Sequence, residues 1–69
     1  MTDEEMEVIN AAERLGQLER DKASEYLRLT QLAGIKGWDA SMKVDAEYAL
    51  PIRRAQAAYD IAVAALRRK

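Results

Sequence analysis

The sequence predicts an all-α fold, an antiparallel hairpin of two long amphipathic helices that dimerises into a four-helix bundle. Thirteen alanines, set against three glycines and one proline, favour helical backbone throughout the 69 residues. Apolar residues recur at steps of three and four along two long segments, and strand-like alternation bounded by turn residues is missing. We expect a single domain, 1–69, with a helix over about 3–33, a bend over 34–40 and a second helix over about 41–67.

The first predicted helix has a clear start and one apolar face. Thr2, with Glu5 three residues later, matches a capping box, and the acidic Asp3 and Glu7 suit the positive end of the helix dipole. We expect Lys22 to lay its aliphatic stem along the apolar face and to hold its ammonium group at the edge. The face itself consists of residues three or four apart: Val8, Ala11, Leu15, Leu18, Lys22, Tyr26, Leu29 and Ala33.

The chain is expected to reverse after this helix. Gly34 follows the last periodic residue, where a left-handed C-terminal cap is common, and Gly37 adds a second flexible point. Asp39 or Ser41 can then cap the second helix. That helix ends in a basic run that suits its negative pole, formed by Arg67, Arg68 and Lys69.

The second segment carries a seam typical of coiled coils. Pro51 lies within it, lacks an amide proton and disfavours helical geometry at Leu50, at a cost of about 3 kcal/mol. Because the seam continues past Pro51, we expect one helix kinked near that residue; a three-helix arrangement that breaks at Leu50 is the alternative. The seam is spaced four-three-four-three-four and consists of Tyr48, Ile52, Ala55, Tyr59, Ala62 and Leu66.

Antiparallel folding determines which residues meet between the helices. Gly16 is expected nearly opposite Ala55, so that the backbones approach closely there. The acidic start of the chain is brought beside its basic end, although exposed ion pairs contribute only about 0 to 1 kcal/mol each. The residues expected in the hairpin or dimer core are Leu15, Leu18, Tyr26, Leu29, Tyr48, Ile52, Ala55, Tyr59, Ala62 and Leu66.

The chain is short for an independent core. A compact monomer of this size buries only about 60% of the surface that its unfolded chain exposes. With neither cysteine nor histidine, disulfides and the usual zinc ligands are not available as additional stabilisation. The apolar face of the first helix is also wider than a single neighbouring helix would cover, since Ile9, Ala23, Leu27 and Leu32 flank it. We therefore expect a homodimer.

Several function classes are disfavoured by composition and motifs. With no histidine and no glycine-rich phosphate loop, we expect neither an enzyme active site nor a metal or cofactor site. Residues 1–36 carry five basic and eight acidic side chains, and residues 37–69 carry six and four, which argues against a nucleic-acid partner. A helical dimer that binds nucleic acid through Arg53, Arg54 and the terminal basic run stays open as an alternative. The acidic start and the absence of a bilayer-length apolar run predict a cytoplasmic protein without membrane attachment.

The bend is the most suggestive segment for binding another protein. Its only tryptophan, Trp38, lies between Ile35 and Met42, and exposed tryptophan and methionine are typical of protein-binding surfaces. We expect Ile35, Trp38 and Met42 to bind a partner; the alternative is that Trp38 packs on Leu32 and Met42 to close the end of the bundle. Leu50 and Ile61 project from the far side of the seam, either toward a second subunit or as another exposed patch.

In length, alanine content, freedom from cysteine and lack of enzyme motifs, the chain resembles small early proteins of temperate bacteriophages, including anti-quorum-sensing proteins that inhibit host regulators. The resemblance is one of overall character and transfers no residue. It implies a modulator or inhibitor of another protein, acting as an anti-activator in the host cytoplasm. The alternative is a structural or assembly component, such as a viral packaging or tail part.

Overall fold

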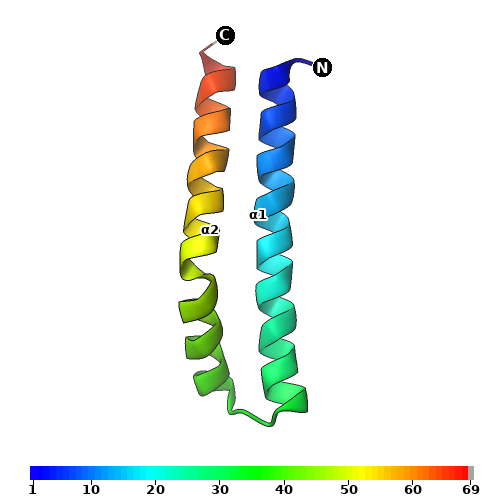
Figure 1. Cartoon of the computed structure of the whole chain (residues 1–69), viewed down its shortest axis with the longest axis vertical. Coiled ribbons are helices and arrows are strands. Elements are labelled where there is room, and N and C mark those ends of the chain that lie inside the picture. The colour runs from blue at the N-terminus through cyan, green and yellow to red at the C-terminus, as the bar shows by residue number, and fades with distance from the viewer. Residues whose placement is uncertain (69) are drawn as a thin grey trace.

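A computed structural model describes residues 1–68, which form two long antiparallel helices and contain no strand within that range (Figure 1). Helix α1 (Asp3–Leu27) continues into a π-helical turn, η1 (Arg28–Leu32), and α2 (Gly37–Arg67) returns alongside it. The molecule measures 50 × 18 × 11 Å, and both ends of the chain lie at the same end of the rod. The predicted all-α fold and helical hairpin are confirmed. The role predicted for Lys69 lies outside the described residues.

Helix α1 begins with the predicted capping box. The backbone N–H of Glu5 donates to Thr2 Oγ1 over 3.2 Å, and the backbone N–H of Thr2 donates to Glu5 Oε1 over 3.3 Å. These two bonds satisfy amide groups that have no partner within the helix. The first helix therefore starts where the sequence places it.

The last turn of the first helix widens before the chain reverses. Thr30 Oγ1 donates to the carbonyl of Tyr26 over 3.0 Å, and η1 has π-helical geometry. Gly34 takes a positive φ of 70°, as predicted, and the Ile35 N–H donates to the Leu29 carbonyl over 3.0 Å. This bond spans one residue more than in a Schellman cap, because the π turn holds one extra residue.

Helix α2 begins at Gly37, earlier than the predicted residue 41, so the predicted bend over 34–40 is too long. Lys36 is the N-cap residue, and its carbonyl accepts the first helical bond from the Ala40 N–H over 2.9 Å. Asp39 and Ser41 lie inside the helix, and the expectation that either caps it is wrong. The left-handed turn at Gly34 completes the reversal alone, which leaves Gly37 free to enter the helix.

Pro51 does not interrupt α2, which continues to Arg67 as one helix of 31 residues. The carbonyl of Glu47 lacks its usual donor, because proline has no N–H, but the turns on both sides keep helical geometry. The three-helix alternative that breaks at Leu50 is therefore wrong.

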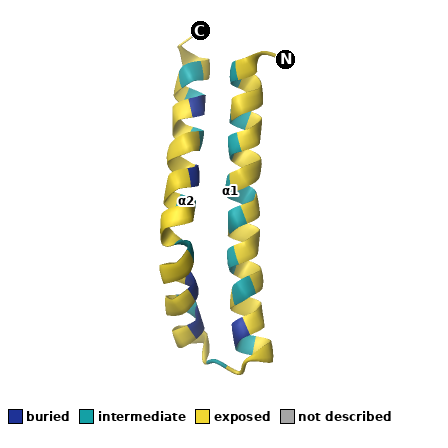
Figure 2. Ribbon diagram, viewed as in Figure 1, coloured by how far each residue is buried: buried dark blue, intermediate teal, exposed yellow. Residues whose placement is uncertain are grey.

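The core between the helices is thin (Figure 2). Leu29, Ala40 and Val44 form a buried cluster near the bend, against which Ile35 and Tyr48 pack. Of the predicted core residues, Leu29, Ala55 and Ala62 are buried, Tyr26 and Leu66 are 37% and 36% exposed, and five are partly buried: Leu15, Leu18, Tyr48, Ile52 and Tyr59. The hairpin alone therefore shelters its core residues only in part.

The expected close approach at Gly16 is not made. A Cβ added to Gly16 would meet only the Arg20 side chain, at 3.6 Å. No atom of Ala55 lies within 4 Å of that Cβ position. Gly16 is thus an ordinary helical position with room for a methyl group.

Substituting the two glycines in turn should give opposite changes in stability. Gly34→Ala should lower the free energy of unfolding by about 1 kcal/mol, because alanine resists a positive φ. Gly16→Ala should raise it by about 0.5 to 1 kcal/mol, because alanine favours helix and the space is open. Urea denaturation at one fixed protein concentration measures both. A loss of stability in both variants would contradict the local geometry described for Gly16.

Candidate protein-binding site

The bend end of the hairpin exposes large apolar side chains. Trp38 is 76% exposed, Met42 57% and Leu32 83%. Trp38 and Met42 are four residues apart in the first turns of α2 and therefore share one face of that helix. We refer to Trp38 and Met42 together as the tip patch.

The start of α2 at Gly37 explains why Trp38 is exposed. Ala40 and Val44 face α1 and are buried. Trp38 lies two residues before Ala40, about half a helical turn away, and therefore points to the other side of α2. The alternative in which Trp38 packs on Leu32 to close the bundle end does not describe this structure, because both side chains are largely exposed.

Ile35 differs from the other two residues expected to bind a partner. Its side chain is partly buried and packs against the cluster of Leu29, Ala40 and Val44. Such an apolar contact between the residue after the glycine cap and the last helical turn commonly accompanies this kind of cap. Ile35 thus belongs to the core at the bend, and the structure does not group it with the tip patch.

A groove of about 520 Å³ runs between the helices near the bend. An ion pair crosses the hairpin there, with 2.7 Å between Lys22 Nζ and Asp45 Oδ1. The Tyr26 hydroxyl lies so near Gly37 that a Cβ on that glycine would be 3.0 Å from it. The groove is lined by Glu19, Lys22, Ala23, Tyr26, Leu27, Ser41, Val44 and Asp45.

The pairing of Lys22 with Asp45 was not expected from the sequence. The position of Lys22 at the edge of the apolar face is as predicted, and Asp45 is the acid that it meets there. The signal was the lysine itself, since a cation at the edge of an apolar stripe can pair with an acid on the facing helix. Its partner follows only once the register of the hairpin is known.

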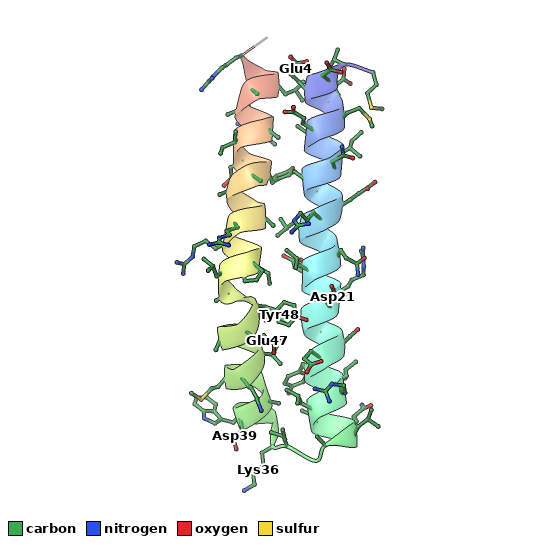
Figure 3. All side chains as sticks on the ribbon, in the orientation of Figure 1. Glu4, Asp21, Lys36, Asp39, Glu47 and Tyr48 are labelled. Carbon is green, nitrogen blue, oxygen red and sulfur yellow. The ribbon has the colours of Figure 1, made fainter. Side chains whose placement is uncertain are left out.

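Tyr48 lies between the helices at the level of Asp21 (Figure 3). Its partial burial, and then the nearby carboxylates of Glu47 and Asp21, raise the pKa of its hydroxyl above the usual value. On the neighbouring turn of α1, Arg28 donates to Glu25 and so lowers the pKa of that carboxyl. Tyr48 therefore favours its neutral form in the folded chain.

The side of α2 that faces away from the buried residues carries a second apolar surface. Leu50 is 50% exposed and Ile61 is 71% exposed. Three exposed alanines lie on the same face, since each is three, four or seven residues from Leu50 or Ile61. We call this surface the outer stripe; it consists of Ala46, Leu50, Ala57, Ile61 and Ala64.

Comparison of the chain with protein-family models, with curated proteins and with solved structures found no match. Neither helix within residues 1–68 has the combination of length and apolar content needed to cross a membrane. Over the same residues, no three acidic side chains gather closely enough to suggest a metal site.

Raising the pH should destabilise the native chain more than its Tyr48→Phe variant. A raised pKa in the folded state means that the contribution of Tyr48 is complete below the unfolded pKa of about 10 and is lost as the pH rises through the folded value. Urea denaturation between pH 8 and pH 11, at about one-unit steps, measures the difference. Parallel pH dependences for the two proteins would rule out the role assigned to Tyr48.

Proposed function

We propose that this chain is a small homodimeric protein-binding module that modulates or inhibits another protein and contacts it through the tip patch. The observation that carries the proposal is the exposure of Trp38, 76%, on the first turn of a long helix. Tryptophan is among the residues that contribute most to protein–protein binding, since it buries a large apolar area and also donates a hydrogen bond.

The position of Trp38 suits binding for a second reason. A side chain on a helical turn loses less conformational freedom on binding than one on a flexible loop, so more of the contact energy appears as affinity. Met42, one turn further along, adds an adaptable apolar contact beside it. Lys36 and Asp39 lie at the same end of the molecule and supply a polar margin (Figure 3).

Self-association is supported by the extent of exposed surface. The chain exposes 5292 Å², whereas a compact monomer of 7.8 kDa exposes about 4,400 Å². The excess, about 900 Å², is similar to the roughly 800 Å² that each partner buries in a standard protein interface. Leu50 and Ile61 are among the large apolar side chains that this surface exposes.

The inhibitory role rests on resemblance in character to small bacteriophage proteins that inhibit host regulators, and a cytoplasmic location is proposed with it. A structural or assembly component is the alternative, in which the same apolar surfaces join many copies. The two proposals differ in the size of the assembly that forms.

Removing the indole should abolish partner binding without unfolding the chain. In a pulldown from the native host, Trp38→Ala should recover at least about tenfold less partner than the native chain, as for loss of a binding hot spot. Met6→Ala is the matched control, because Met6 is 45% exposed and lies on α1 near the opposite end. Circular dichroism checks that helicity is kept. Undiminished recovery by a fully helical Trp38→Ala protein would remove the tip patch from the proposal.

The assembly should contain no more than two chains. Light scattering over a concentration series should show a mass rising from one chain to two and then remaining constant, because a two-fold interface is closed. Growth beyond the dimer would favour the assembly component. A constant mass of one chain at the highest concentration would contradict self-association.

A further inference from the structure

Two charged residues of opposite sign lie along one edge of the outer stripe on α2. Arg53 and Asp60 are seven residues apart, or about two turns, so they lie on the same edge of the stripe. Within residues 1–68 neither side chain forms an ion pair, and Asp60 accepts only an intrahelical hydrogen bond, 3.0 Å from Gln56 Nε2. These two charges therefore remain available to another molecule.

We propose that the outer stripe binds the outer stripe of a second copy of this chain, with the two α2 helices antiparallel and Arg53 of each copy facing Asp60 of the other. This inference rests on the self-association in the proposed function and specifies its surface, direction and register. It gives a layer in the order α1–α2–α2–α1, because the stripe faces away from α1.

Two-fold symmetry and charge together select the antiparallel direction. When two antiparallel helices are related by a two-fold axis, the same edge of each lies beside the other, so Arg53 meets Asp60 twice. In a parallel pair the two-fold axis runs along the helices, so the edge of one copy that carries Arg53 and Asp60 lies beside the opposite edge of its partner, and Arg53 does not meet Asp60. The opposite charges are satisfied only in the antiparallel pair.

The apolar residues of the stripe agree with this register. With Arg53 opposite Asp60, Leu50 of one copy lies within a turn of Ile61 of the other, and Ala57 lies close to the two-fold axis. Small residues at the axis let the helices approach closely, while the larger pair packs on either side. The two large apolar members of the stripe, 50% and 71% exposed, are thus the ones that become covered.

A competing antiparallel register pairs Arg54 with Glu47 on the other edge of α2. That register moves Ile61 opposite Ala40, which already packs against α1, and leaves Ile61 without a large apolar contact. It also moves the second copy over Trp38. The Arg53–Asp60 register keeps the tip patch clear, so one dimer presents two such patches.

Charge reversal tests the register. On the purified full chain, Arg53→Asp and Asp60→Arg should each raise the dimer dissociation constant at least about fivefold at low salt, because two attractive contacts become repulsive. A mixture of the two variants should recover dimerisation, because in the mixed dimer the introduced aspartate faces the introduced arginine and the native Arg53 faces the native Asp60. Sedimentation velocity over a concentration series measures all three. Glu13→Arg, on the exposed face of α1, is the control with the same change of charge as Asp60→Arg.

Single cysteines test the direction, since the native chain contains none. Ala57→Cys should be joined to its equivalent by a short thiol crosslinker, because the two positions meet near the axis. Leu50→Cys should not be, because in the proposed register the two copies of residue 50 lie about 20 Å apart along the helices. Crosslinking of both variants would establish a parallel pair, and crosslinking of neither would exclude the outer stripe.

The outcomes separate this inference from the proposed function. A native chain that dimerises while the charge-reversal mixture shows no recovery would overturn the α2 pairing and leave self-association intact. A native chain that stays monomeric would overturn both, and the Trp38→Ala pulldown would then test the tip patch alone. Circular dichroism of each variant shows whether it has kept its helices.

Discussion

Each helix of this hairpin has a single neighbour, and most features of the molecule follow from that constraint. Two helices in contact share one line of side chains, so α1 itself contains no buried residue, and the buried part of α2 is three alanines and Val44. Everything beyond that line is exposed, whatever its chemistry. The exposed apolar surfaces at Trp38 and at Leu50 and Ile61 are therefore consequences of the architecture.

The register of the hairpin is held mainly near the bend. Gly34 turns the chain with a positive φ, Ile35 packs back on the cluster around Leu29, and Lys22 pairs with Asp45 across the groove. Together these contacts determine where α2 begins and which way its first turn points. The exposure of Trp38 follows from that starting point, so the cap and the candidate binding surface are linked through the same few residues.

Local chemistry allowed the helix start at Thr2, the turn at Gly34 and the hairpin itself to be predicted from the sequence. The errors concern places where two segments interact. Asp39 and Ser41 are sound capping residues in isolation, yet the turn ends early enough for Lys36 to take that position. The alternative that breaks at Leu50 is also wrong, since α2 passes Pro51 without interruption, in agreement with the expectation of a single second helix. The Lys22–Asp45 pair depends on the register of two distant segments, which periodicity along one helix does not specify.

The uneven distribution of buried side chains along the hairpin has a mechanical consequence. Leu29, Ala40 and Val44 form one buried cluster near the bend, whereas the fully buried residues toward the termini are two separate alanines, Ala55 and Ala62. Helix contacts of that kind separate at lower free energy than a packed cluster does. The end of the rod that holds the two termini is therefore expected to open at a lower free energy than the bend end.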